Sequence, residues 1–191
     1  MKTINCKFLS ETSGYKCIID SLSLTNEPIA ISTHHKSNKS NKNVKILHFS
    51  LCTFDGFPTN IHDIFPELMC LKIKNSKFPH GIKRENFAQL NNLIELSITN
   101  CDLKVLPEDL LNDLLELENI SFANNKIEEI DEKIFDNLFY LSFIDLRGNT
   151  NINIQYSGTN TSSTSLDDVK NAIKSMSLQE EKKFEILQEE N

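Results

Sequence analysis

The chain has 191 residues, of which 39% are hydrophobic and 25% charged, a composition that fits one domain with tails. Its net charge is −7, but residues 1–45 carry seven Lys against three acids, whereas residues 46–191 carry 13 Lys and Arg against 24 acids. No apolar run approaches the roughly 18 residues that span a bilayer, and an acidic body favours a protein partner with a cationic or mixed surface over nucleic acid.

Residues 1–32 precede the regular part of the chain. They contain no apolar stretch of the roughly 7 to 15 residues that mark a secretory signal peptide, so the chain is either intracellular or without its leader. Cys6 and Cys17 flank Gly14 and Tyr15, and residues 17–24 alternate loosely, which predicts a strand.

Residues 33–43 are polar, low in complexity and basic. Such a segment could contact phosphates or a polyanion, but its few Lys have no interleaved aromatic residues. A flexible, solvated loop is the favoured interpretation.

An internal repeat of 24 or 25 residues organises residues 44–154, with repeats starting at 44, 68, 93, 117 and 141. In the best repeat, positions 1, 4, 6, 9, 11, 14, 19 and 22 are Leu117, Ile120, Phe122, Asn125, Ile127, Ile130, Phe135 and Leu138. The preceding repeat matches it at the same offsets, with Cys101 at position 9.

This L-x-x-L-x-L-x-x-N/C-x-L pattern resembles the leucine-rich-repeat family over residues 44–154. The resemblance implies an α/β-type solenoid of about five repeats. It would be a right-handed coil with a curved parallel β-sheet on its concave face and irregular or 3-10 segments on its back.

The residue types explain the pattern independently. Positions 4 and 6 point to the same side of a strand, so they face the core while positions 3, 5 and 7 face out. Asn125 and Asn149 at position 9 can satisfy backbone groups that the turn leaves unpaired, as smaller residues do in other repeats. Six Phe are interpreted as an internal spine rather than a ligand cage: Phe49, Phe54, Phe57, Phe78, Phe122 and Phe135.

The N-terminal segment resembles the cysteine-bridged cap of extracellular leucine-rich-repeat proteins, particularly small secreted ones of insects. This resemblance implies a Cys6–Cys17 disulfide; the alternative is two unrelated thiols in a cytosolic chain. Cys52 and Cys101 share a repeat position two repeats apart, about 10 Å, which is too far for a disulfide.

Cys70 is predicted on the concave face, with His48 of the preceding strand diagonally near it. Such a pair could form a nucleophile or half a metal site. No third ligand or orienting Asp accompanies it, and the chain has no glycine-rich phosphate loop, H-E-x-x-H or C-x-x-C. We therefore expect no catalytic residue, metal ion or cofactor.

Residues 155–164 are rich in Ser, Thr, Asn and Gly and are predicted to be a linker. Residues 165–191 form a charged tail in which Leu166, Val169, Ile173 and Met176 recur at helical spacing. The tail is either a helix, which could dock on the last repeat or mediate dimerisation, or a disordered segment.

The predicted function is extracellular protein binding through the concave face, without an enzymatic activity. The alternative is an intracellular scaffold or regulator without a disulfide. Candidate binding residues at the outward positions are His48, Ser50, Lys72, Lys74, Glu95, Ser97, Thr99, Asn119, Ser121, Phe143, Asp145 and Arg147. Possible glycosylation sites are Asn38, Asn119 and Asn160.

Overall fold

The computed structural model describes residues 2–32, 35, 38–158 and 164–189, with side chains of the last helix described through Met176 and at Leu178. The strands are β1 (Lys2–Ile4), β2 (Lys7–Glu11), β3 (Gly14–Asp20), β4 (Ser23–Leu24), β5 (Ile29–Ile31), β6 (Val44–Ser50), β7 (Thr53–Phe54), β8 (Cys70–Lys74), β9 (Glu95–Thr99), β10 (Val105–Leu106), β11 (Asn119–Ser121), β12 (Glu129–Ile130), β13 (Phe143–Asp145) and β14 (Gln155–Ser157). The helices are η1 (Asn41–Asn43), α1 (Ile61–Ile64), η2 (Arg84–Asn86), η3 (Glu132–Phe135) and α2 (Leu166–Glu189).

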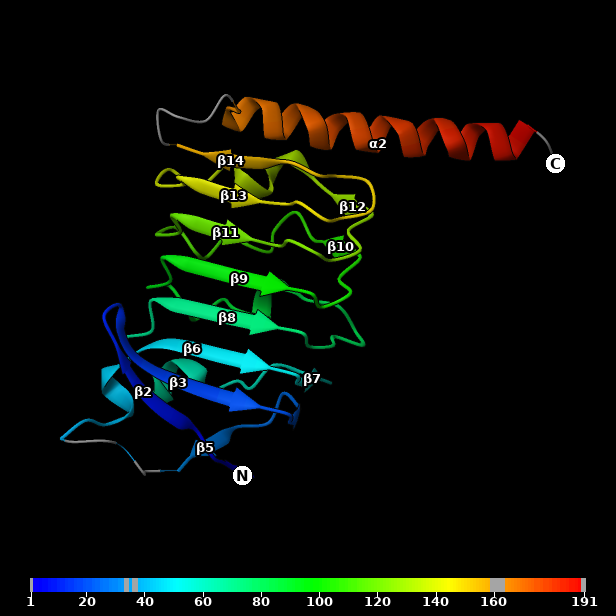
Figure 1. Cartoon of the computed structure of the whole chain (residues 1–191). Coiled ribbons are helices and arrows are strands. Elements are labelled where there is room, and N and C mark those ends of the chain that lie inside the picture. The colour runs from blue at the N-terminus through cyan, green and yellow to red at the C-terminus, as the bar shows by residue number, and fades with distance from the viewer. Residues whose placement is uncertain (1, 33–34, 36–37, 159–163, 190–191) are drawn as a thin grey trace.

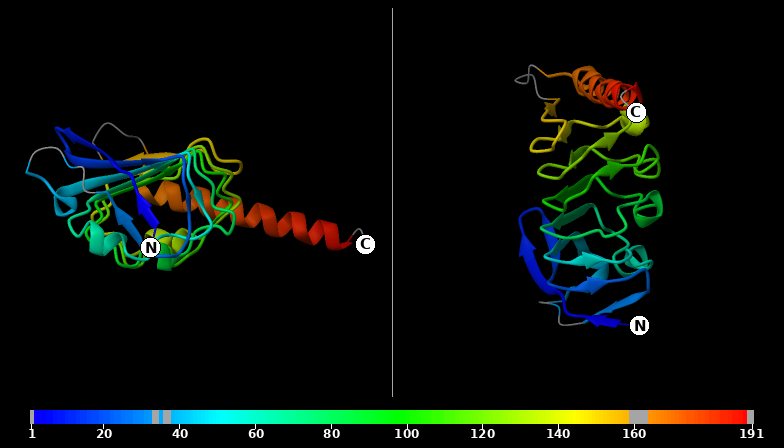
Figure 2. Two further views of the ribbon diagram at one scale, coloured as in Figure 1. Left: turned by 90° about the horizontal axis from the view of Figure 1, so that it is seen from below. Right: turned by 90° about the vertical axis from the view of Figure 1, so that its right-hand side faces the viewer.

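Successive coils stack into a solenoid whose main sheet has eight strands in the order β14-β13-β11-β9-β8-β6-β3-β2 (Figure 1). Each of the five predicted repeats supplies one parallel strand, β6, β8, β9, β11 and β13. The view along the coil axis shows these strands overlying one another (Figure 2, left). The predicted solenoid with a parallel sheet and 3-10 segments on its back is confirmed, while the handedness of the coil stays a prediction.

The coil begins earlier than the repeat pattern indicates, because β3 pairs in parallel with β6. Tyr15 pairs with Val44, a separation of 29 residues, which exceeds the repeat length because residues 33–43 are inserted between the two strands. The N-terminal region is therefore both a sixth coil and a cap, with β2 antiparallel to β3 at the end of the sheet.

The predicted disulfide joins Cys6 to Cys17, with 5.6 Å between the two Cα atoms. Both cysteines lie in the core of the cap. Next to them, the His35 ring lies 4.0 Å from the Phe8 ring, and Lys39 Nζ lies 4.5 Å above the Tyr15 ring. The described residues of the predicted flexible loop thus include contacts with the cap hairpin.

The core is filled as the repeat predicts, with Leu and Ile of the strands fully buried. The predicted phenylalanine spine is confirmed for the coils nearer the cap, since Phe54 stacks on Phe78 with 4.7 Å between ring centroids and contacts Phe49 edge-on. Phe122 and Phe135 are buried farther along the core. Cys52, Cys70 and Cys101 are free and buried, as the spacing argument predicts for Cys52 and Cys101.

Position 9 carries the predicted polar ladder. Asn125 Oδ1 accepts a hydrogen bond from Cys101 N (2.9 Å), and its Nδ2 donates to Ile98 O (2.8 Å). One coil further along, Asn149 Oδ1 accepts a hydrogen bond from Ile127 N of the preceding coil (3.2 Å). These side chains satisfy buried backbone groups of two coils at once, so they join each coil to its neighbour.

Position 8 ends each strand in a left-handed conformation. The residues there are Ser21, Leu51, Asn75, Asn100, Asn124 and Gly148, all with φ between 51° and 72°. Their N–H groups continue the stacking, as when Leu51 N donates to Lys74 O (3.1 Å). Asn and Gly adopt this conformation readily, whereas Leu does not.

The C-terminal end departs from the expected linker, since residues 155–157 form β14, antiparallel to β13. The composition suggested a linker, but Ile154 and Tyr156 pack against the core and hold this segment in the sheet.

The tail forms the helix α2. Ser165 and Asp168 cap its start, with Asp168 N donating to Ser165 Oγ (3.1 Å) and Ser165 N donating to Asp168 Oδ2 (2.7 Å). Val169, Ile173 and Met176 are buried against the last coil, and the helix then extends past the coil (Figures 1 and 2). α2 therefore covers the open core, as a terminal element of a solenoid must.

Candidate functional site

The concave face is built from three columns of outward side chains, one from each of positions 3, 5 and 7. The first column reads Ile46, Cys70, Glu95, Asn119 and Phe143. The second reads His48, Lys72, Ser97, Ser121 and Asp145. The third, by repeat position, reads Ser50, Lys74, Thr99, Ala123 and Arg147.

All twelve predicted binding residues therefore lie on one face of one sheet. Asp145 is buried, Lys74 and Arg147 are exposed, and the others are half-buried. Half-buried polar side chains on a regular sheet present a surface of fixed shape.

Three cations near His48, namely Lys16, Lys72 and Lys74, form a basic patch at the cap end of the face, and two of them are neutralised within the molecule. Lys72 Nζ lies 2.8 Å from Glu95 Oε1, and Lys16 Nζ of β3 lies 3.3 Å from Glu11 Oε1. Burial opposes the charge on Lys72, but the hydrogen bond to Glu95 and the surrounding acidic groups together outweigh it and raise the pKa of Lys72. Lys74 forms no ion pair with any described residue, so it is the cation that this patch offers to a partner.

Cys70 and His48 do not form a catalytic pair. Cys70 lies opposite Ile46, and its Sγ donates to Glu95 Oε2 (3.2 Å), while His48 lies opposite Lys72. Burial and the Glu95 carboxylate raise the pKa of Cys70 to about 12. Because the thiolate is the nucleophile, this cysteine is unreactive at neutral pH.

The protonation state of His48 also argues against a catalytic pair with Cys70. Burial, followed by the charges of Lys16, Lys72 and Lys74, lowers its pKa, so the ring is neutral near pH 7. Its Nδ1 is buried without a hydrogen-bond partner among the described residues. Among those residues there is also no cluster of His, Cys, Asp and Glu able to hold a metal ion.

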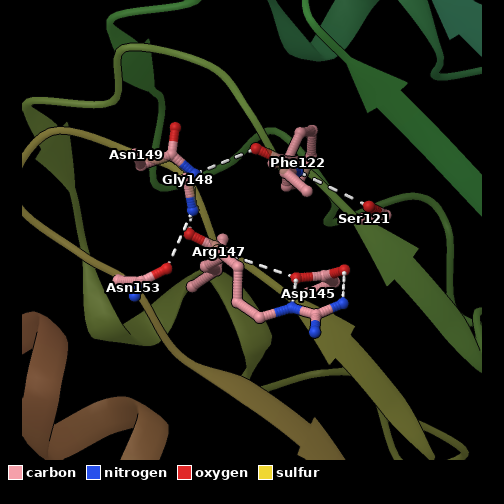
Figure 3. A network of polar contacts seen from close by, with 9 residues as sticks. Ser121, Phe122, Asp145, Arg147, Gly148, Asn149 and Asn153 are labelled. Carbon is pink, nitrogen blue, oxygen red and sulfur yellow. Dashed lines mark hydrogen bonds and ion pairs between the residues drawn. The ribbon is translucent and has the colours of Figure 1, made fainter.

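At the C-terminal end of the face, the Arg147 side chain donates two hydrogen bonds to Asp145, from Nε to Oδ1 (2.9 Å) and from Nη2 to Oδ2 (2.8 Å) (Figure 3). Burial would raise the pKa of Asp145, but the hydrogen bonds from the Arg147 side chain and backbone outweigh it and lower that pKa. Gly148 N donates to Asn153 Oδ1 (2.9 Å) beside this pair. A Cβ on Gly148, whose φ is 72°, would meet Asn124 Oδ1, so a larger residue here would require the Asn124 side chain to move.

The possible glycosylation sites differ in placement. Asn119 is half-buried on β11, where a glycan would stand on the concave face, and Asn38 is exposed. Asn160 lies outside the described residues.

Two features escaped the sequence analysis. The first is the network of Cys70, Glu95 and Lys72, although Cys70 and Glu95 share a repeat position in adjacent coils and could have been paired on that basis. The second is the set of large apolar side chains exposed away from the concave face, among them Leu51 and Phe139. In the described part of the chain, no helix is long and apolar enough to cross a membrane.

Comparison with solved structures identifies the fold. A chain from the Toll–Spatzle complex of Drosophila, described as a molecular hub in development and innate immunity, superposes with a TM-score of 0.53 at 16% identity. The match covers 63% of the present chain but only 17% of the Toll-complex chain. The present chain thus has the leucine-rich-repeat fold and spans a small part of that larger protein.

Two further matches are looser. A chain of the LRIM1/APL1C complex gives a TM-score of 0.49 at 17% identity, covering 78% of the present chain and 32% of its own. The leucine-rich-repeat ectodomain of the receptor kinase SOBIR1 from Arabidopsis thaliana gives 0.43 at 23% identity, covering 75% and 78%. No protein-family model matches the sequence, and no curated protein does either.

Proposed function

For this leucine-rich-repeat solenoid, we propose that the concave face binds a protein partner. The observation that carries the proposal is the face itself, in which five parallel strands hold the outward side chains in straight columns. Its centre is formed by the half-buried Ser97 and Ser121, which leave room for groups that a partner inserts.

The two ends of the face differ in chemistry, which favours a protein surface over a small ligand. The end nearer the cap offers the free cation Lys74, while the other end offers Phe143 beside the Asp145–Arg147 pair. Aromatic residues and Arg are the types that most often anchor protein interfaces. A partner of mixed charge suits this combination.

We further propose that the protein works outside the cell. The Cys6–Cys17 disulfide supports this, since disulfides persist mainly in oxidising compartments. The resemblance of the cap to that of small secreted insect proteins is part of the same proposal. The alternative is an intracellular scaffold or regulator in which these two cysteines are reduced.

Self-association through α2 is a second, subordinate proposal. It is favoured by the extension of the helix past the coil (Figure 1). Removal of residues 178–191 would convert a dimer to a monomer in sedimentation velocity, whereas a full-length chain that sediments as a monomer would contradict this role.

The proposed binding face is tested by placing large side chains at its centre. Ser97→Arg with Ser121→Arg should abolish capture of the partners that the unaltered protein retains from an extract of its source tissue. Gln89→Arg, an exposed position on the back of the coil, is the matched control. Equal capture by the two variants would contradict binding through the concave face, provided both melt like the unaltered protein.

A further inference from the structure

A second surface lies at the side of the coil, where the chain turns into β9, β11 and β13. Three large apolar side chains are exposed there: Leu115 (50%), Phe139 (85%) and Tyr140 (61%). We call this set, with Glu116 and Glu118, the lateral edge. It is separate from the concave columns, because these residues lie before the strands begin.

The lateral edge is continuous across coils. Leu115 and Phe139 share one repeat position, and the backbones beside them are joined by the hydrogen bond from Ser142 N to Glu118 O (2.8 Å). The preceding coil is joined in the same way by the hydrogen bond from Glu118 N to Ile94 O (2.9 Å), and there the patch ends. Because neighbouring strands lie about 4.8 Å apart, these side chains form one patch rather than isolated points.

The fold does not require these residues to be apolar. The neighbouring positions already supply the core, since Leu114, Leu117, Leu138 and Leu141 are buried. In the preceding coil the position of Leu115 and Phe139 is taken by Asn91, which is exposed and polar. A Phe that is 85% exposed where the repeat accepts Asn adds little to the core, and together with Leu115 and Tyr140 it is of the kind of exposed apolar patch that marks interaction sites.

The charge around the patch is negative. Glu116 and Glu118 are exposed and take part in none of the ion pairs formed by the described residues. The nearby cation Lys170 is already bound to Asp136, with 2.6 Å between Nζ and Oδ1. An incoming segment would therefore meet apolar side chains flanked by free carboxylates.

We propose that the lateral edge docks a basic amphipathic segment of a partner protein. Its apolar side chains would cover Leu115, Phe139 and Tyr140, and its Lys or Arg would pair with Glu116 and Glu118. Such a segment complements both the apolar side chains and the carboxylates of the lateral edge. Its docking does not depend on binding at the concave face.

The probe is a pair of fluorescent peptides of about four helical turns with Leu on one face and either Lys or Glu elsewhere. Fluorescence anisotropy with the full chain should show binding of the Lys peptide about tenfold tighter than that of the Glu peptide. Phe139→Ser with Tyr140→Ser keeps the charge and should weaken binding about tenfold. The control is Val105→Ser, which removes an apolar side chain that is 41% exposed and lies outside the lateral edge. This change should alter binding of the Lys peptide less than about twofold.

Charge reversal tests the contribution of the two carboxylates separately from that of the apolar side chains. Glu116→Lys with Glu118→Lys should weaken binding of the Lys peptide while leaving the thermal unfolding of the protein nearly unchanged. The proposal is overturned if neither peptide binds the unaltered protein, if both bind equally, or if the Phe139/Tyr140 variant binds as tightly as the Val105 control. It is also overturned if the unaltered protein self-associates and that variant is a monomer, since the edge would then join two copies.

Discussion

Cys70 Sγ donates a hydrogen bond to Glu95 Oε2 across adjacent strands, with 3.2 Å between the two atoms. The other carboxylate oxygen of Glu95 pairs with Lys72. One acid thus satisfies a thiol and an ammonium on the concave face. It keeps the thiol protonated and removes most of the positive charge that the sequence places there.

The first prediction concerns this thiol. In Glu95→Gln the negative charge beside Cys70 is lost, so its pKa falls from about 12, although burial still holds it above the usual range. Alkylation of Cys70 by iodoacetamide at about pH 9 should then become several-fold faster. Peptide mass spectrometry measures the rate, with Cys52 and Cys101 as internal controls. An unchanged rate would show that Glu95 does not govern the thiol.

The second prediction concerns Leu51, which is 58% exposed and has a φ of 53°. Its left-handed conformation costs about 1–2 kcal/mol in a residue with a branched side chain. Leu51→Asn should therefore raise the free energy of unfolding by about 1 kcal/mol in urea titrations. The reverse change Asn100→Leu, at the same repeat position, should lower it by a similar amount. A loss of stability in the Leu51 variant would contradict this account.

The third prediction is a pH dependence at Asp145, whose pKa is lowered in the folded state. A carboxylate of this kind stabilises the fold above its unfolded pKa of about 3.9, and the contribution is lost as pH falls through the lowered folded pKa. Arg147→Ala should lower the free energy of unfolding modestly near pH 7, since solvent screens the exposed guanidinium, and this cost should vanish in acid once Asp145 is protonated in both the folded and the unfolded state.

The control for this pair is Lys126→Ala, which removes the exposed ion pair with Asp102 and should lower the free energy of unfolding less than Arg147→Ala does. Urea unfolding at several pH values measures both variants. A cost for Arg147→Ala that does not change with pH would mean that packing, not the carboxylate, carries the effect.

The fourth prediction concerns the compartment. Peptide mapping of the native protein without reduction should find Cys6 linked to Cys17. Replacing both by Ser should lower the free energy of unfolding by about 3 kcal/mol, as expected for a loop of about 10 residues. Two free thiols in the native protein would instead favour the intracellular alternative.

The sequence predicted the coil well because each repeat carries the same constraint. Leu96 and Ile98 recur as Ile120 and Phe122, and only stacked strands bury all four at once. β3 was harder to place, since the insertion of residues 33–43 breaks the spacing to β6. The strand β14 was missed because its pairing with β13 is antiparallel, so it follows no repeat position.

The positions of the concave-face residues could be predicted from the sequence, but the ion pairs that neutralise their charges could not. Alternation places Lys72 and Glu95 on one face, yet their diagonal pairing depends on side-chain conformations that no repeat alignment provides. For the same reason the sequence could not choose between a docked and a frayed tail. The stripe of Val169, Ile173 and Met176 needed the open end of the last coil to bury it.

The central claim is that the concave face holds the partner, and site-specific photo-crosslinking tests it most directly. A photo-reactive residue in place of Ser97, at the centre of the face, should yield a covalent adduct with one partner in an extract of the source tissue. The same residue in place of Gln89, on the back, should yield none. Adducts formed from position 89 and not from position 97 would contradict the claim.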